Sequence, residues 1–413
     1  MTRFPFAALA ALLLLTLSGC ANLRADRIPP APVLLVSIDG LGAGQYDPTR
    51  MPNLARIARE GARAAAMVPS YPTLTFPNHY SIVTGLHPDR HGIVHNTMRD
   101  AALGGFWLSN PEAVGDGRWW GGTPVWVAAE RAGLRTAAFF WPGTEAAIDS
   151  VRPTRWRVYE DGIPLQTRVD TVLGWLSEPA ATQPRFMTLY FEHVDEAAHS
   201  HGPHSAEAHA EQRNVDAALG RLLDGMDARG LGGAVNIVVV SDHGLAEVPR
   251  GNTVIIEAMV DPADVELVTA GQVVGFIAKP GREAAAERAL IGRHAHYQCW
   301  RKGDLPARWH YGGHPRVPAI ICQMDEGWDA VKRERLAEQP RTSTRGSHGF
   351  DPANPSMHAV FFARGPAFRT GAMLPAIASV DVYPLLMRLL GIQAAPNDGS
   401  LAPLLPALRE RAE

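Results

Sequence analysis

The sequence has few cysteines, no low-complexity tract and almost no net charge. Its 413 residues include 3 cysteines, and 39 lysines and arginines nearly balance 42 aspartates and glutamates, for a formal net charge of -3. This balance supplies no bulk electrostatic attraction to nucleic acid or to an acidic membrane surface. No fixed-period repeat points to a repeat protein. With 46% hydrophobic and 20% charged residues, the composition is that of a globular protein with a sizeable core, in one large α/β domain or two smaller ones.

The apolar run near the N-terminus is too short to cross a membrane. It covers residues 7–17, follows Arg3 and leads into the sequence Leu-Ser-Gly-Cys, which ends at Cys20; a spanning helix needs about 20 apolar residues. The pattern is typical of a secretory signal peptide over residues 1–19, and the alternative is a buried N-terminal helix. Leu-Ser-Gly-Cys also resembles a bacterial lipoprotein signal. That resemblance implies lipid attachment at Cys20, and Ala21 after it implies a periplasmic protein anchored to the outer membrane.

Cys299 and Cys322 are the two cysteines that remain behind this segment. In an oxidising compartment two cysteines can form a disulfide. They can equally be two separate buried thiols, and the sequence leaves both possibilities open.

Strand-like apolar runs alternate with helix-like segments along most of the chain. Continuous apolar runs predict strands buried in a parallel sheet, and amphipathic stretches predict helices. The predicted strands are Val33–Ile38, Thr136–Phe140, Phe186–Phe191, Val235–Val240 and Ala359–Phe362; the predicted helices are Pro52–Glu60, Pro124–Arg131, Leu165–Leu176, Ser205–Arg229 and Val380–Leu390. The alternation predicts an α/β fold, with a mostly parallel central sheet and helices on both faces.

The alternation weakens over residues 252–328. Short strand-like pieces there surround one helix-like stretch, Glu283–Leu290. No Ser/Gly-rich linker separates this region from its surroundings. We therefore expect a small α+β insertion, packed against a main catalytic domain that extends over residues 30–400.

Three aspartates and three histidines follow predicted strands. They are Asp39, Asp195, His199, Asp242, His243 and His348. Functional groups gather at the carboxyl ends of strands in open α/β sheets, and carboxylate oxygens with imidazole nitrogens suit zinc. Asp195 and His199 are spaced to share one face of a helical turn. Each residue alone fits a cap, a turn or a solvated loop, but their joint occurrence after successive strands predicts a metal centre.

Thr75 lies in the stretch "YPTLTFPNHY", residues 71–80, where a helix is expected to begin. Pro77 suits the first turn of a helix through Thr84, which puts Thr75 near free backbone N–H groups and the positive end of the helix dipole. Such a position attracts phosphate, and a hydroxyl bound to metal there can act as a nucleophile. The alternative is that Thr75 only caps the helix.

Long, ordered motifs resemble the nucleotide pyrophosphatase/phosphodiesterases of the alkaline phosphatase superfamily, in their compact bacterial form. The motifs are "PTLTFPNHYSIVTGLHPDRHGIVHN", "SIDG", "WPG", "DEAAHSHGP", "SDHG" and "GSHGFDP", and the resemblance covers residues 32–391. It implies an alkaline phosphatase-like fold and a hydrolase with two Zn²⁺ ions and a phosphothreonine intermediate.

The resemblance also implies a role for each candidate residue. Thr75 is the implied nucleophile, Asn96 the implied donor to a phosphoryl oxygen, and Phe76 and Tyr159 the implied walls around a nucleobase. The implied ligands of one zinc are Asp39, Thr75, Asp242 and His243, and those of the other are Asp195, His199 and His348. Around Asp195 the chain reads "HVDEAAH", with alanines in place of the family's usual serine and glycine, which puts the substrate neighbours there in doubt.

The implied reaction is hydrolysis of nucleotide phosphodiester and phosphoanhydride bonds to nucleoside 5′-monophosphates, with no nucleic-acid polymer as partner. A sulfatase needs a Cys/Ser-x-Pro-x-Arg motif, whereas Thr75 is followed by Phe-Pro-Asn. A phosphomonoesterase would need an arginine beside Thr75, and no arginine is adjacent to it. A choline-lipid phosphodiesterase of the same superfamily and a non-catalytic, zinc-holding lipoprotein stay open as alternatives.

Overall fold

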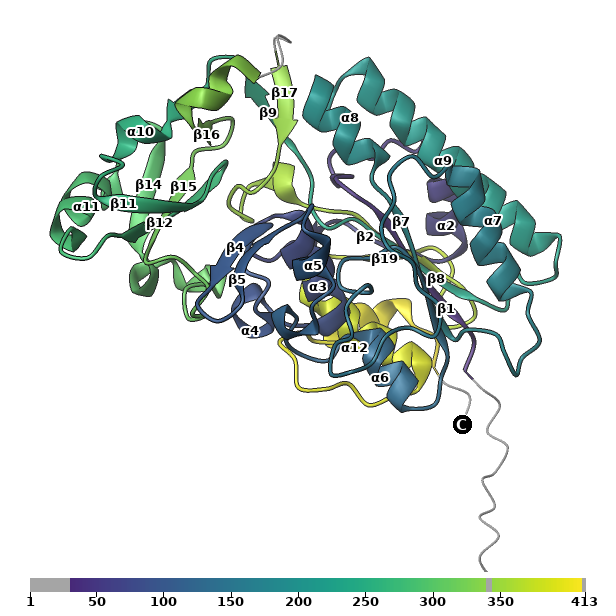
Figure 1. The fold of residues 1–413 in the computed structure, drawn as a ribbon. Coiled ribbons are helices and arrows are strands. Elements are labelled where there is room, and N and C mark those ends of the chain that lie inside the picture. The colour runs from purple at the N-terminus through teal and green to yellow at the C-terminus, as the bar shows by residue number, and fades with distance from the viewer. Residues whose placement is uncertain (1–29, 339–343, 411–413) are drawn as a thin grey trace, which may run out of the picture. The chain divides into compact units, whose positions relative to one another are not determined.

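The structure is a computed structural model and describes residues 30–338 and 344–410 (Figure 1). The predicted signal peptide, residues 1–19, and the predicted lipid-attachment residue Cys20 lie outside the described residues. Within the described ranges, no helix has the length and apolar character that crossing a bilayer requires.

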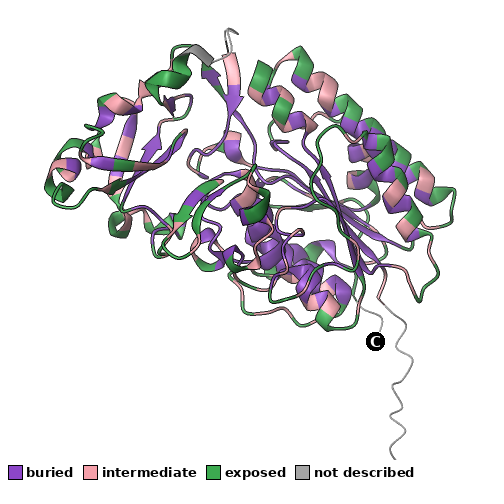
Figure 2. Ribbon diagram, viewed as in Figure 1, coloured by how far each residue is buried: buried purple, intermediate pink, exposed green. Residues whose placement is uncertain are grey.

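Four parallel strands form the centre of the main sheet. β1 (Val33–Ile38) lies between β7 (Phe186–Phe191) and β8 (Asn236–Val240), and β6 (Thr136–Phe139) pairs with β7. Every residue of these four strands is buried (Figure 2). Strands covered on both faces carry apolar side chains in both directions, which explains their continuous apolar sequences.

Three more strands complete the sheet. β18 (Phe361–Arg364) runs antiparallel to β8 and to β2 (Ala62–Ala64), and β19 (Ala372–Leu374) runs parallel to β2. The order of the seven strands is β19-β2-β18-β8-β1-β7-β6. The predicted mostly parallel sheet is confirmed. The strand expected at 359–362 begins later, because Ala359 forms isolated bridges to other segments instead.

Helices cover both faces of this sheet, as predicted (Figure 1). On one face, α2 (Pro52–Glu60), α7 (Leu165–Leu176) and α9 (Ala206–Asp227) pack against alternate β1 residues such as Leu34 and Val36. On the other face, the β1 residues Val33 and Leu35 share a core with α3 (Thr75–Thr84), α6 (Val125–Arg131) and α12 (Val382–Leu390).

The insertion has a sheet of its own. Its five antiparallel strands, in sheet order, are β11 (Val265–Thr269), β12 (Val273–Ala278), β15 (Ile320–Met324), β14 (Tyr297–Arg301) and β13 (Gly292–Arg293). Helix α11 (Glu283–Leu290) and these strands share a separate apolar core around Phe276 and Leu290. The contacts within the chain nevertheless group this region and the main sheet into one compact unit from Ala31 onward.

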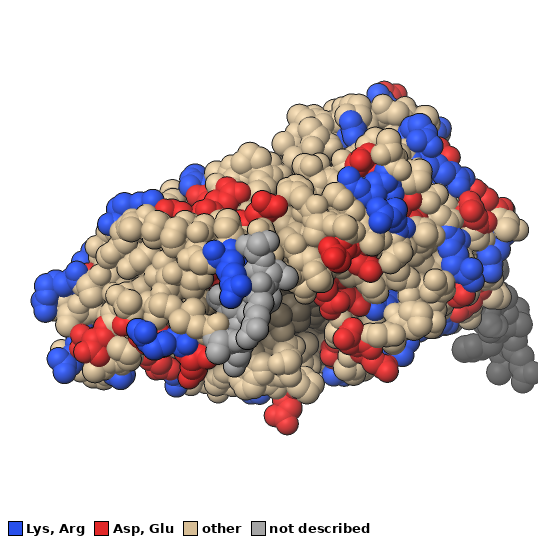
Figure 3. All heavy atoms as spheres, turned by 90° about the horizontal axis from the view of Figure 1, so that it is seen from above, with Lys and Arg blue, Asp and Glu red and all other residues tan. Residues whose placement is uncertain are grey.

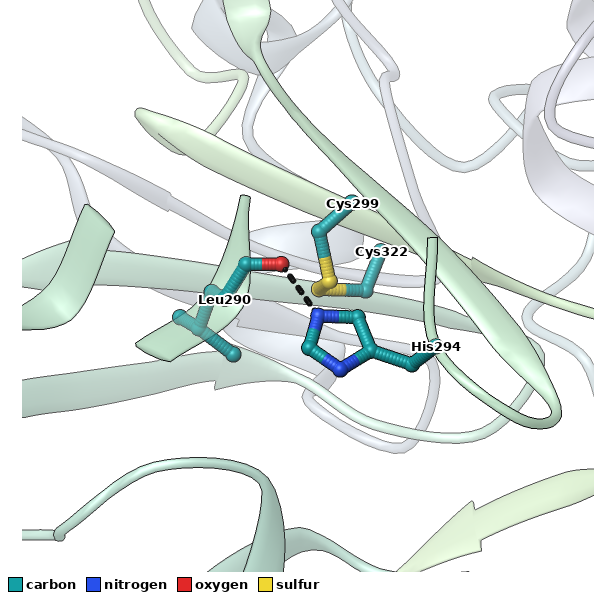
Figure 4. The surroundings of a disulfide bond; sticks show 4 residues. All are labelled: Leu290, His294, Cys299 and Cys322. Carbon is teal, nitrogen blue, oxygen red and sulfur yellow. Dashed lines mark hydrogen bonds between the residues drawn. A yellow bond between two sulfur atoms is a disulfide. The ribbon is translucent and has the colours of Figure 1, made fainter. Parts of the chain in front are cut away.

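A disulfide joins the two cysteines whose pairing the sequence left open. Cys299 of β14 and Cys322 of β15 are directly opposite in the antiparallel register, with their Cα atoms 3.9 Å apart. Beside them, His294 Nε2 donates to the carbonyl oxygen of Leu290 at 2.8 Å (Figure 4). The disulfide therefore closes a loop, residues 300–321, which we call the disulfide loop.

Shorter elements connect these layers. The remaining strands are β3 (Met67–Val68), β4 (Thr97–Asp100), β5 (Gly104–Trp107), β9 (Ala246–Pro249), β10 (Thr253–Ile255), β16 (Asp329–Val331), β17 (Thr344–Ser347) and β20 (Ile377–Ala378), and the remaining α-helices are α4 (Pro88–His91), α5 (Pro111–Val114), α8 (His193–His201) and α10 (Ile256–Met259). Turns of 3₁₀-helix cover Gly117–Trp119, Lys302–Asp304, Ala307–Trp309, Arg333–Glu338, Pro355–Met357, Ser379–Asp381 and Ala402–Ala407. Seen from above (Figure 3), positive and negative side chains are interspersed over the surface, in keeping with the small net charge.

Candidate active site

The predicted ligand residues gather where the central parallel strands end. Asp39 follows β1, and Asp242 and His243 follow β8. Asp195 and His199 lie on helix α8, which begins directly after β7. Because these strands are parallel neighbours, their carboxyl ends lie at one edge of the sheet.

His348 reaches the same edge by a different route. It follows β17, which pairs with β9 and not with the main sheet. β9 in turn begins three residues after His243. The β9–β17 ribbon therefore returns the chain to the end of β8, and the ring of His348 stacks on that of His243 with centroids 3.6 Å apart.

The six aspartates and histidines among the seven predicted ligands are brought together. The ligand atoms of Asp195, His199 and His348 lie within 4.8 Å of one another, and so do those of Asp39, Asp195 and His243. Asp242 adjoins the second group, with its Oδ2 2.9 Å from Nε2 of His243. We call these six residues the metal-ligand cluster.

The three histidine rings of this cluster are oriented like metal ligands. In each, Nδ1 lies within hydrogen-bond distance of a backbone carbonyl oxygen: His199 with Gly346 at 3.0 Å, His243 with Gly244 at 3.2 Å and His348 with Thr73 at 2.8 Å. A carbonyl oxygen can only accept, so Nδ1 carries the hydrogen and Nε2 keeps a lone pair. This is the arrangement in which proteins hold histidine on a metal.

Unpaired carboxylate oxygens face these lone pairs. Asp39 Oδ1, Asp195 Oδ1 and Asp242 Oδ2 are buried and have no hydrogen-bond partner among the described residues. An unpaired buried acceptor costs about 1–3 kcal/mol, and three of them in one place strongly favour a bound cation. The donor set of carboxylates and imidazoles therefore fits a metal ion.

The electrostatics of the cluster point the same way. Burial and the charge of Asp242 raise the pKa of Asp39 well above its ordinary value. Burial lowers the pKa of His348 well below its ordinary value and keeps the ring neutral. Crowded carboxylates and a neutral imidazole are the ligand states that a cation stabilises.

Gly40 lets the β1 end approach helix α8. Its φ is +71°, and a Cβ there would lie 2.9 Å from Cα of Asp195 and 2.7 Å from Cδ1 of Leu245. Only glycine tolerates both this conformation and this approach. The "SIDG" motif thus brings Asp39 and Asp195 close to each other.

A buried ion pair fixes the start of helix α8. Arg168 of α7 is fully buried and donates two hydrogen bonds to the carboxylate of Glu192, the residue before α8. It also donates to the carbonyl oxygen of Tyr190 at 2.9 Å. Removing one partner of a buried pair costs about 3–5 kcal/mol, so this contact ties α7, β7 and α8 together close to Asp195.

Thr75 is the first residue of helix α3, as the sequence predicts. Its Oγ1 lies 3.4 Å from Nε2 of His243. The cap residue, Leu74, makes no side-chain cap hydrogen bond, so the cap residue itself does not cover this end of the helix. The backbone N–H of Phe76 donates to Oδ1 of Asn96 at 3.0 Å, which leaves the amide nitrogen as the donor end of Asn96.

The two predicted aromatic walls belong to different aromatic groups. Phe76 is partly buried against Phe106 and Trp120, with ring centroids 6.0 and 5.9 Å away. Tyr159 is 42% exposed, and its ring lies 6.3 Å from that of Tyr190. Tyr190 in turn donates to Asp39 Oδ2 at 2.6 Å, which places Tyr159 two contacts away from the metal-ligand cluster.

Sequence reasoning missed His79. It is fully buried on α3, with Nε2 2.8 Å from the hydroxyl of Ser37, and Nδ1 2.9 Å from the carbonyl oxygen of Thr75 and 3.3 Å from Asp242 Oδ2. Nδ1 carries the hydrogen that the carbonyl accepts, so Nε2 accepts from Ser37 and has no lone pair free for a metal. The signal was its position four residues after Thr75, on the same helix face.

Comparison with known proteins gives the family. The family model "Type I phosphodiesterase / nucleotide pyrophosphatase" matches residues 33–351. Ectonucleotide pyrophosphatase/phosphodiesterase family member 3 of Rattus norvegicus is 34% identical over 401 residues, covering 92% of this chain and 45% of its own length. An uncharacterised pyrophosphatase/phosphodiesterase of Schizosaccharomyces pombe is 33% identical over 395 residues, covering 92% of this chain and 81% of its own. The chain thus spans just under half the length of the rat relative.

Solved structures agree. Murine ectonucleotide pyrophosphatase/phosphodiesterase 5, in an inactive threonine-to-alanine variant in complex with AMP, superposes with a TM-score of 0.85 at 31% identity, covering 92% of this chain and 100% of that one. The human protein of the same name gives a TM-score of 0.86, also at 31% identity and with the same coverage of both chains. The alkaline phosphatase-like α/β fold is confirmed, and the chain belongs to the type I phosphodiesterase/nucleotide pyrophosphatase family.

Proposed function

We propose that the chain hydrolyses nucleotide phosphodiester and phosphoanhydride bonds and releases nucleoside 5′-monophosphates. The observation that carries this proposal is the hydroxyl of Thr75 at the start of helix α3, 3.4 Å from His243 of the metal-ligand cluster. Two properties of the murine neighbour support it, since that protein is inactive as a threonine-to-alanine variant and is in complex with AMP.

We propose two zinc ions as the cofactor. Asp39, Asp242, His243 and Thr75 would hold one, and Asp195, His199 and His348 the other. Bound zinc supplies Lewis acidity, which lowers the pKa of hydroxyl and water oxygens and stabilises negative charge on phosphoryl groups.

The chain's own residues would carry two in-line displacements. Oγ1 of Thr75 forms a bond to phosphorus, the bond to the leaving oxygen breaks, and the hydroxyl proton passes to solvent. The positive end of the α3 dipole and the amide nitrogen of Asn96 stabilise the phosphoryl oxygens as their charge grows. Water then attacks the phosphothreonine, the bond to Oγ1 breaks, and the nucleotide leaves with the original configuration at phosphorus.

Phe76 and Tyr159 are the proposed base-binding residues. Aromatic faces stack on any nucleobase, with about 1–3 kcal/mol per base in nucleic-acid sites. This predicts broad acceptance of different bases.

A second candidate is a choline-lipid phosphodiesterase. Burial and the carboxylates of Glu192, Glu196 and Asp161 raise the pKa of the Tyr159 phenol, and the Tyr159 N–H donates to Glu145 at 2.8 Å. Negative surroundings of an exposed aromatic ring favour a substrate with a cationic group over a polyphosphate.

We also propose a lipid-anchored location in the periplasm, at the outer membrane. The Cys299–Cys322 disulfide supports an oxidising compartment. The anchor itself rests on the sequence around Cys20.

The test compares p-nitrophenyl esters of thymidine monophosphate, of phosphocholine and of phosphate, for the wild type, Thr75→Ala and Thr75→Ser. We expect the nucleotide ester to be the best substrate and Thr75→Ala to lower its turnover by about a thousandfold or more, with Thr75→Ser partly active. Elemental analysis should find both metal equivalents in all three proteins. Wild-type turnover in Thr75→Ala would exclude the phosphothreonine, and preference for the phosphocholine ester would favour the second candidate.

A further inference from the structure

The disulfide loop carries four consecutive residues, three of which contact chain segments that lead to residues of the candidate site. They are Arg308, Trp309, His310 and Tyr311, which we call the 308–311 segment. The segment comes from the insertion, whereas its partners Tyr71, Val94 and Asp351 lie within two to four positions of Thr75, Asn96 and His348 in the sequence. Trp309 and Tyr311 are buried, at 3% and 8% exposure, whereas Arg308 and His310 are exposed.

Trp309 holds the loop that leads to Thr75. Its ring stacks on Tyr71 with centroids 4.0 Å apart and planes 4° from parallel, and the ring of Tyr311 meets Tyr71 edge-on at 5.1 Å. Tyr71 is 1% exposed. Thr75 is the fourth residue after it, and Thr73 between them donates to the carbonyl oxygen of Phe350 at 2.8 Å. A shift of Tyr71 is therefore passed to Thr75 along a short stretch of backbone.

Tyr311 holds the segment that carries Asn96. Its hydroxyl donates to the carbonyl oxygen of Val94 at 3.0 Å, two residues before Asn96. Because Asn96 accepts from the Phe76 N–H, Tyr311 and Trp309 reach the start of helix α3 from two directions.

Arg308 and His310 complete the set of contacts. Nη1 of Arg308 donates to Asp351 Oδ1 at 2.6 Å, three residues after His348. The ring of His310 stacks on His87 at 4.5 Å, beyond the end of helix α3.

The segment is itself anchored on both sides. The ring of Trp300, on β14, meets Trp309 edge-on at 5.2 Å. The backbone N–H groups of Gly312 and Gly313 donate to the carboxylate of Asp89. At the base of the loop, Cys299 and Cys322 lock β14 to β15 (Figure 4).

We propose that the 308–311 segment positions Thr75 and Asn96 for phosphoryl transfer. This inference rests on the proposed function, in which Thr75 is the nucleophile. In-line attack needs the reacting atoms at near-contact distance, and a displacement of about 1 Å can cost roughly a hundredfold in rate. The insertion thus acts on the reaction without touching substrate, through Tyr71 and Val94.

The experiment measures kcat and KM of the zinc-loaded protein for bis-p-nitrophenyl phosphate, a substrate without a nucleobase. Trp309→Ala should lower kcat by about tenfold or more, since a misplaced Thr75 reacts more slowly. It should change KM by less than about twofold, because the contacts that bind the substrate equally in the ground state and the transition state are kept. Trp309→Phe keeps a stacking ring and should retain most of kcat. Trp328→Ala is the matched control: this tryptophan of the same region stacks on His296 at 3.4 Å and should leave kcat unchanged.

Tyr311→Phe tests the same proposal if the Trp309→Ala protein does not fold. It removes only the hydroxyl that binds Val94, and it should lower kcat severalfold. In both variants, peptides over residues 71–76 or 92–98 should exchange amide hydrogens faster than in the wild type and in Trp328→Ala.

The outcomes separate two failures. If the wild type cleaves no phosphodiester, the proposed function is wrong. If the wild type is active while folded Trp309→Ala and Tyr311→Phe match Trp328→Ala in kcat and in exchange, the segment does not position the nucleophile. A KM increase without a kcat change would overturn the proposal as well.

Discussion

A single buried histidine, His79, connects the proposed nucleophile with the metal-ligand cluster. Its Nε2 accepts from the hydroxyl of Ser37 on β1, and its Nδ1 donates to the carbonyl oxygen of Thr75, with Oδ2 of Asp242 3.3 Å away. Strand β1, helix α3 and the end of β8 therefore share one imidazole. At this scale the site depends on side chains that hold other side chains.

The first prediction at this scale concerns the proposed stacking of Tyr159 on the nucleobase. Tyr159→Ala should lower kcat/KM for p-nitrophenyl thymidine monophosphate by about tenfold, because losing one stacking face removes about 1.4 kcal/mol. Hydrolysis of bis-p-nitrophenyl phosphate, which has no base, should stay nearly unchanged.

The control for Tyr159 is Trp156→Ala. Trp156 lies nearby on the same loop and packs on Arg152, with 4.9 Å from Cζ to the ring centroid. It should affect neither substrate. Equal losses on both substrates in Tyr159→Ala would show that Tyr159 supports the fold and does not bind the base.

The sequence predicted which candidate ligands would lie close together, but not the residues that support them. Asp39, Asp242 and His243 are recognisable in the sequence because they are polar residues at the ends of apolar strands. Tyr190 lies inside such a strand, where an aromatic residue fits the buried pattern equally well without its hydrogen bond to Asp39. Supporting contacts of this kind join residues far apart in sequence, so no local pattern records them.

At the scale of elements, apolar strands and amphipathic helices were predictable and their ends less so. Helices α2 and α7 have the predicted bounds. Ser205 only caps α9, with its Oγ accepting from the Ala208 N–H at 3.0 Å, so that helix begins one residue later than expected. Residues 379–381 form a 3₁₀ turn before α12. Cap residues and first turns resemble the helix in composition but lack its hydrogen bonds, so the sequence does not show where the helix begins.

Strand β17 could not be predicted from its own residues. Its sequence, Thr-Arg-Gly-Ser, has no apolar alternation, and its partner β9 lies about a hundred residues earlier. The pairing depends on the tertiary fold, which determines what a short polar strand meets. His348 was therefore predicted as a ligand, but its place beside His243 was not.

Metal removal should loosen the elements that the ligands join. Without a cation, the carboxylates of Asp39, Asp195 and Asp242 repel one another in a buried site. A ligand present at a hundredfold excess over its Kd stabilises a protein by about 2.7 kcal/mol, so dialysis against a chelator should lower Tm by several degrees. Hydrogen exchange should rise in α8 and β17, and added zinc should reverse both changes.

The comparison region for metal removal is the insertion sheet. β12 and β14 share a core without any member of the metal-ligand cluster, so their exchange should not change. A protein that elemental analysis shows to be metal-free, yet with an unchanged Tm, would contradict a structural role for the metal.

At the scale of the whole molecule, the prediction concerns location. Cys20→Ala should move the protein from the membrane fraction to the soluble or unprocessed fraction. Stable anchoring takes more than one acyl chain, and the substitution removes the residue at which these chains are predicted to be attached. Fractionation of cells that express each form measures this. A wild-type protein already soluble in the periplasm would contradict the lipid anchor.

The order of the ligands along the chain has a consequence for how the protein is made. A ribosome delivers Asp39 early and His348 late, with the insertion between them. Until β17 has been synthesised and has paired with β9, the second proposed zinc lacks a ligand. Filling of this second proposed site must therefore come late in folding, after the long loops have closed. A metal there would stabilise the finished fold but could not nucleate it, and a chain stopped before His348 would have the ligands of the first proposed zinc but not all those of the second.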